Sequence, residues 1–229
     1  MTTAPSLTES STAPQTRQMD LGRLFGVPVM SGLLILNCLA LGRSGGRGQL
    51  AAGVLSLSGT VLSVLFYLLL IGSFLRRTPA VATTRSPVAV SAAFVASYLS
   101  FVIALVPRGR PGAVALMVAD VLVISGLALS VWSISRLHRS FSMIAQARTV
   151  VRSGPYRLVR HPLYAGELVA VLGIAVMTWS LAAMAIWAVL CGLQAYRAQH
   201  EEKVLLAALP DYAEYRSTTG RLIPRVRVR

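Results

Sequence analysis

The stretch Gly154–Gly166, GPYRLVRHPLYAG, places two arginines, a histidine and two tyrosines against an apolar run that continues to Met177. Polar groups at the mouth of a membrane helix are unfavourable, so their presence there is a clue to function. A further apolar run, Leu181–Ala195, follows directly after residues 178–180. This spacing predicts a tight helical hairpin whose two members are short for a bilayer span of about 20 residues.

The chain as a whole has the composition of an integral membrane protein. Of its 229 residues, 55% are hydrophobic and only 13% are charged. Four apolar runs long enough to span a bilayer precede the hairpin, roughly at residues 24–41, 50–75, 88–106 and 113–134. We therefore expect an all-α, polytopic membrane protein of about six helical segments. Residues 21–135 would hold four transmembrane helices, and residues 136–229 the hairpin and a cytosolic tail.

The basic residues predict an orientation, because positive charge in short loops is retained on the cytoplasmic side. With the N-terminus inside, the outer loops hold only four of the 22 basic residues, namely Arg43, Arg47, Arg108 and Arg110. Both termini are therefore predicted to be cytoplasmic. Residues 1–20 are rich in Ser, Thr and Pro, and we expect them to form a disordered cytoplasmic tail.

The net charge of +14 does not indicate a nucleic-acid partner, because the basic residues flank apolar spans instead of clustering on a folded domain. Anionic lipid headgroups are the simpler partner. The use of arginine almost throughout, with Lys203 as the single lysine, indicates a bacterial protein of the inner membrane. Cys38 and Cys191 are expected to be small buried hydrophobic side chains, and we expect no metal site. The sequence does not predict an oligomeric state.

The first polar cluster marks the start of a helix. Pro162 suits the first helical position, where its missing N–H costs nothing, and His161 then occupies the N-cap. The free N–H groups and positive dipole end of such a helix suit a carboxylate or a phosphate. Gly166 would allow another backbone or a flat ligand to approach closely.

The second cluster is Tyr196–Lys203, YRAQHEEK, at the end of the sixth apolar run. Residues four apart share a helix face, which aligns Tyr196 with His200 and Arg197 with Glu201. The hairpin would bring both clusters to one cytoplasmic surface. Membrane anchoring explains any one of these residues alone, but two converging clusters favour a functional site.

Two further polar residues lie in or just beyond the fourth apolar run. Asp120 lies inside the fourth run and is either functional or a polar partner of a neighbouring hydroxyl such as that of Ser125. His138 is expected to be interfacial.

Four ordered motifs resemble the isoprenylcysteine carboxyl methyltransferase family, within the broader group of membrane phospholipid methyltransferases. They are Ser153-Gly154-Pro155-Tyr156, Arg160-His161-Pro162-x-Tyr164-x-Gly166, Arg197-x-x-x-Glu201-Glu202, and Tyr212-x-x-Tyr215-Arg216 with Leu222-Ile223-Pro224. The resemblance covers roughly residues 151–226, and an ordered set is much more specific than any single motif.

The resemblance implies an S-adenosylmethionine-dependent methyltransferase that takes its cofactor from the cytosol and a lipophilic small-molecule or lipid acceptor from the bilayer. It makes residues 136–229 the S-adenosylmethionine-binding catalytic region, in which Arg160, His161, Pro162, Tyr164, Gly166, Glu201 and Glu202 line the cofactor pocket. Tyr156, Tyr196 and His200 are further cofactor-binding candidates. The catalytic candidates are Arg160, Arg197, Glu201 and Glu202.

The acceptor chemistry stays open at this point. A carboxylate acceptor needs mainly a cation, supplied by Arg197 or Arg160, whereas an amine needs a general base such as His200 or Glu202. Carboxyl O-methylation of an isoprenoid or other lipid acid is the preferred hypothesis. The alternatives are phospholipid-type N-methylation, a non-catalytic scaffold and a transporter. Glu167 departs from the family pattern, and it either contacts a polar part of the substrate or marks a different lineage.

Overall fold

The structure is a computed structural model that describes residues 26–43, 50–76, 82–84, 86–137, 146–147 and 149–225. Its α-helices are α1 (Val27–Arg43), α2 (Leu50–Arg76), α3 (Pro87–Val102), α4 (Ala113–Leu137), α5 (Pro162–Thr178), α6 (Leu181–Ala208) and α7 (Tyr212–Thr218). Short 3-10 turns are η2 (Ile103–Leu105) and η4 (Gly154–Arg157), and β1 (Ala82–Thr83) pairs antiparallel with β2 (Gln146–Ala147). The prediction of an all-α polytopic membrane protein is confirmed. Residues 1–20 and His138 lie outside the described residues.

Helix lengths differ from the prediction at two places. Within the described residues, four helices are long and apolar enough to cross a membrane: Leu57–Arg76, Pro87–Leu105, Ala113–Leu137 and Leu181–Ala208. The prediction that the sixth run is short was wrong, because α6 continues for 28 residues, about 42 Å, through the polar cluster. The polar cluster contains Ala, Gln, Glu and Lys, which are good helix formers and so continue the helix. Conversely, α1 has only 17 residues, at the lower limit for a span.

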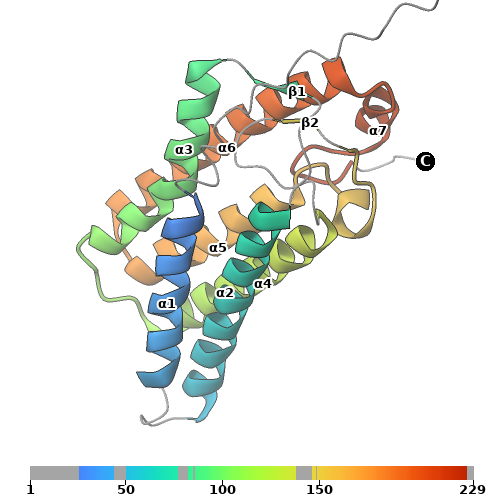
Figure 1. The fold of residues 1–229 in the computed structure, drawn as a ribbon. Coiled ribbons are helices and arrows are strands. Elements are labelled where there is room, and N and C mark those ends of the chain that lie inside the picture. The colour runs from blue at the N-terminus through green and yellow to red at the C-terminus, as the bar shows by residue number, and fades with distance from the viewer. Residues whose placement is uncertain are drawn as a thin grey trace, which may run out of the picture.

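The helix ends that carry the polar clusters lie at one end of the bundle (Figure 1). There, the starts of α1 and α5 and the ends of α2 and α4 share a buried cluster of Met30, Leu70, Phe74, Ile134 and Leu163. At the opposite end the Gly109 amide donates to the Thr178 carbonyl at 2.9 Å, which joins the α3–α4 loop to the end of α5. The helices therefore alternate in direction, as a polytopic bundle requires.

The predicted hairpin is present and turns at Trp179. This residue has left-handed backbone angles, φ 50° and ψ 50°, and its amide donates to the Ala175 and Val176 carbonyls to end α5. The Trp187 indole N–H donates to the Leu168 carbonyl at 2.9 Å and ties α6 back onto α5. The start of α5 and the end of α6 consequently lie together.

The most extensive contact in the bundle is between α4 and α5, and it depends on small residues. A side chain at Gly166 would place its Cβ 2.5 Å from the Ser130 Oγ, and one at Gly126 would clash with the backbone of Ala170. In membranes, small residues of this kind let helix backbones approach closely. The sequence predicted that another backbone or a ligand would approach Gly166 closely, and in the structure the backbone of α4 does so.

The cysteines differ from their predicted burial. Cys38 is exposed on the outer surface of α1, so the prediction that it is buried was wrong, and Cys191 is half-buried in α6. Among the described contacts α1 packs chiefly on α2, which leaves its other face open to lipid. Both thiols are free.

We predict that Gly126→Ala lowers stability by about 1–3 kcal/mol, because the added methyl group overpacks the contact with α5. Thermal unfolding of the protein in detergent measures the change. The matched control is Gly192→Ala, in α6, where a Cβ meets nothing within 4 Å. That control should be neutral or gain up to about 1 kcal/mol from helix propensity. Equal melting temperatures for the two variants would contradict close packing at Gly126.

Candidate functional site

The start of α5 is built as the sequence predicts, with His161 at the N-cap and Pro162 in the first turn. The residues before it are covered by the C-terminal segment. The Arg160 amide donates to the Gly220 carbonyl at 2.8 Å, and the His161 amide donates to the Arg221 carbonyl at 3.0 Å. The C-terminal segment therefore folds over this end of the hairpin, as expected for the tail.

Glu202 is the centre of the contacts that hold this segment. Its side chain is 3% exposed, and its Oε1 lies 2.8 Å from the Arg160 Nη2. Arg221 donates twice, from Nε to Oε1 at 3.1 Å and from Nη2 to Oε2 at 3.2 Å. The Arg216 Nε lies 3.6 Å from Oε2, and the His161 Nε2 lies 3.3 Å from Oε1. One buried carboxylate thus joins α6, the start of α5 and the tail.

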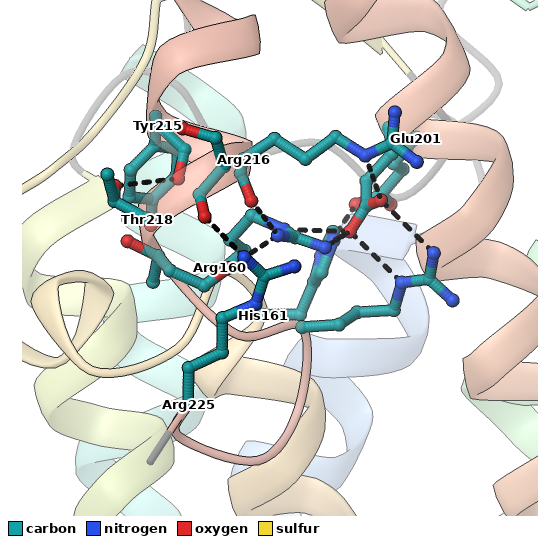
Figure 2. A network of polar contacts seen from close by, with 11 residues as sticks. Arg160, His161, Glu201, Tyr215, Arg216, Thr218 and Arg225 are labelled. Atoms are coloured by element: carbon teal, nitrogen blue, oxygen red, sulfur yellow. Dashed lines mark hydrogen bonds and ion pairs between the residues drawn. The ribbon is translucent and has the colours of Figure 1, made fainter. Parts of the chain in front are cut away.

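Arg160 is committed to the same joint. Its Nε donates to Glu202 at 2.9 Å, and its Nη1 donates to the carbonyls of Arg216 and Thr219. In the view of Figure 2, Arg160 and His161 lie between Tyr215 and Thr218 on one side and Glu201 on the other. Arg160 and Glu202 are candidates for contact with the substrate, but in this structure their charges are already paired with each other.

Glu201 lies in a different setting from Glu202. Its side chain is 19% exposed, and its Oε2 lies 3.6 Å from the His161 Nδ1. The Tyr164 hydroxyl donates to its other oxygen, Oε1. The rings of His161 and Tyr164 stack with their centroids 5.5 Å apart and an angle of 6° between their planes. The hairpin thus brings together the two predicted clusters, with an accessible carboxylate beside two aromatic rings.

The remaining cofactor candidates lie in different surroundings. Tyr196 and His200 contact each other with ring centroids 4.4 Å apart, which confirms their predicted alignment on α6. Tyr156 is buried in η4, and its carbonyl accepts a 2.6 Å hydrogen bond from the Tyr215 hydroxyl. Burial raises the pKa of Tyr215 to about 12, so this hydroxyl keeps its proton and remains a donor. Gly166 faces α4.

A cavity of about 230 Å³ lies on the other side of Tyr164, inside the bundle. Its walls are mostly apolar side chains from all six long helices, among them Met30, Phe66, Ala96, Leu127, Val171 and Leu190. One end is polar and holds Tyr164, Glu167, Gln194 and Arg197. The cavity thus combines a mostly apolar lining with one charged end.

The polar end is a connected chain of hydrogen bonds. The Gln194 Nε2 donates to the Glu167 Oε2 at 2.8 Å, and the Gln194 Oε1 accepts from the Arg197 Nη1 at 3.1 Å. The Arg197 guanidinium carbon lies 4.7 Å from the centroid of the Tyr164 ring, within the range of a cation–π contact. Tyr164 therefore touches both the Glu201 cluster and the charged end of the cavity.

Gln194 was missed by the sequence prediction, although a signal was present. It is a polar residue within an apolar run, three positions before Arg197 and so on the same helix face. Glu167 was noted only as a departure from the family pattern. Asp120 is half-buried in α4 and outside the described lining of the cavity, and the Ser125 hydroxyl bonds the Leu122 carbonyl of its own helix.

Comparisons with known proteins agree with the motifs. Residues 114–209 match the sequence model of the phospholipid methyltransferase family. The cobalt-zinc-cadmium resistance protein CzcN of Cupriavidus metallidurans is 44% identical over 80 residues, 34% of this chain and 37% of that protein. The nickel-cobalt-cadmium resistance protein NccN of Alcaligenes xylosoxydans xylosoxydans is 30% identical over 111 residues, 47% of this chain and 52% of that protein.

These alignments span about half or less of the length of each relative. The family match, by contrast, contains α4 and α5 and all of α6, and with them the Glu201 cluster and the polar end of the cavity. Over residues 114–209, therefore, the chain is similar to the phospholipid methyltransferase family.

Proposed function

We propose that the protein transfers the methyl group of S-adenosylmethionine to a lipophilic acceptor that enters from the bilayer. The proposal rests on the position of Tyr164. Tyr164 bonds to Glu201 on one side, and on the other it lines the apolar cavity under the Arg197 guanidinium. A methyltransferase of this kind needs a polar cofactor site and an apolar acceptor site that meet at one point, and Tyr164 is such a point.

The residues around Glu201 fit the charges of S-adenosylmethionine. Its sulfonium and ammonium groups favour a carboxylate and aromatic faces, which Glu201 and the stacked rings of His161 and Tyr164 provide. Its carboxylate favours the positive end of a helix, which the start of α5 provides. The cofactor, when bound, supplies an electrophilic methyl group. In this proposal Tyr196 and His200, whose rings contact each other, form the neighbouring wall.

The two adjacent carboxylates have different roles in this account. Glu201 is partly exposed and faces the rings, so it contacts the cofactor. Glu202 is buried and paired with arginines, so it positions the C-terminal segment over the site. Arg160 is likewise a positioning residue. In this proposal, the side chains that contact the cofactor are therefore Glu201, Tyr164 and His161.

The size of the cavity limits how much of the acceptor it can enclose. Its volume of about 230 Å³ is smaller than typical small-molecule pockets of about 300–1,000 Å³, so it encloses only the reacting end of a lipid. The tail of the acceptor then extends between the helices into the bilayer. Within the cavity, alignment of the acceptor and exclusion of water account for much of the rate. A bacterial inner membrane with the site end in the cytoplasm, as the arginines predict, would give the cofactor access.

We predict that Glu201→Gln weakens S-adenosylmethionine binding about 10-fold to 100-fold, because a charge-assisted interaction contributes roughly 1.5–3 kcal/mol. Equilibrium binding to detergent-purified protein measures this. The parallel assay follows a labelled methyl group into a total lipid extract, and base lability of the product separates a methyl ester from an N-methyl group. Glu214→Gln, at an exposed ion pair with Arg152, is the matched control. Absence of both binding and transfer in the unchanged protein would contradict the proposal.

For the neighbouring carboxylate the expected effect is on structure. Glu202→Gln leaves the buried Arg160 without its counter-ion and should destabilise the protein by about 3 kcal/mol. Limited trypsin digestion should then cleave the segment after Arg216 and Arg221 faster than in the unchanged protein. Glu214→Gln should change stability by less than about 1 kcal/mol. Unaltered cleavage in Glu202→Gln would show that this carboxylate does not hold the segment.

A further inference from the structure

We propose that Glu167 accepts the proton released by the acceptor, and that the acceptor is an amphiphile whose nucleophile carries a proton, an amine or a hydroxyl. This inference rests on the proposed function and deepens it, because it selects among acceptor chemistries. It also departs from the preformed carboxylate that the sequence favoured.

Glu167 lies close to Tyr164 in the lining of the cavity. Tyr164 and Glu167 are three residues apart on α5 and share a helix face, and both line the cavity. Of the described residues that line it, Glu167 is the single acid and Arg197 the single guanidinium. An acceptor that reaches Tyr164, where the cofactor site and the cavity meet, therefore lies beside the carboxylate of Glu167.

The charges at the polar end of the cavity disfavour a carboxylate acceptor. Gln194 is 1% exposed, and its amide is fixed by donating to Glu167 at 2.8 Å while accepting from Arg197 at 3.1 Å. The guanidinium and the carboxylate are thus held at the same end of the cavity, where each offsets the charge of the other. A carboxylate acceptor placed there would meet the like charge of Glu167 in an apolar surrounding, which is unfavourable. A neutral amine or hydroxyl meets no such repulsion.

The chemistry is balanced with these groups alone. A lone pair on the nitrogen or oxygen of the acceptor forms a bond to the methyl carbon of S-adenosylmethionine. The bond from that carbon to sulfur breaks, and its electron pair stays on sulfur, which becomes a neutral thioether. The Glu167 carboxylate takes one proton from the acceptor as this bond forms: the proton of a hydroxyl, or the proton that the ammonium form of an amine must give up before its lone pair is free. A carboxylate acceptor has no proton to release and would leave Glu167 without a role.

The test uses purified full-length protein in lipid nanodiscs, labelled S-adenosylmethionine and three probes with the same tail: dodecylamine, 4-dodecylphenol and dodecanoate. We expect label in the amine or the phenol and none in dodecanoate. Glu167→Gln should lower kcat for the methylated probe about 100-fold, the range of a lost general base, with unchanged S-adenosylmethionine affinity. Glu167→Asp keeps a carboxylate and should recover part of the rate. Thermal unfolding verifies that both variants fold.

Three results would overturn the inference. They are faster methylation of dodecanoate than of the other probes, full activity in Glu167→Gln, and no transfer to any of the three probes. The proposed function is judged separately, by the affinity for S-adenosylmethionine and by label entering a total lipid extract. Methylation of dodecanoate with cofactor binding intact would leave the proposed function standing while removing Glu167 from it.

Discussion

The carboxylate of Glu202 is 3% exposed and lies within ion-pair distance of Arg160, Arg216 and Arg221. A charge buried to this degree is tolerated only when its partners are in place, so the α6 end, the α5 start and the C-terminal segment must assemble together. Because Glu201 is the adjacent residue of the same helix, fixing Glu202 also fixes the direction of Glu201. The orientation of the accessible carboxylate toward His161 and Tyr164 is a consequence of the buried one.

Tyr164 then has a role on each side of α5. Its hydroxyl bonds to Glu201, and its ring supports the guanidinium of Arg197 at the polar end of the cavity. The close contact of α4 with α5 at Gly126 and Gly166 holds this helix firmly in the bundle. The side chain of Tyr164 therefore contacts both Glu201 and the polar end of the cavity, as the proposed transfer between a polar donor and an apolar acceptor requires.

The features predicted correctly from sequence are those set by local chemistry. The hairpin followed from a three-residue gap between apolar runs, and the N-cap at His161 followed from the proline after it. The ring contact between Tyr196 and His200 followed from their spacing of four. The convergence of the two polar clusters needed only the hairpin.

The features that were missed depend on contacts between distant residues. The pairing of Arg160 with Glu202 joins residues 42 apart, and nothing in either neighbourhood distinguishes this pair from a substrate-binding one. The link from Gln194 to Glu167 crosses between helices and depends on their rotation about their own axes. The length of α6 was underestimated because hydrophobicity ends at Ala195, whereas helix propensity does not.

The proposed function requires the cofactor site and the acceptor cavity to meet at Tyr164. The most direct measurement is an experimental structure of the protein in lipid with S-adenosylhomocysteine bound. We expect the ligand ammonium at Glu201 and its sulfur beside Tyr164, facing the cavity. A ligand bound away from Tyr164, for example in the surface hollow lined by Thr149, Arg152 and Pro210, would contradict it.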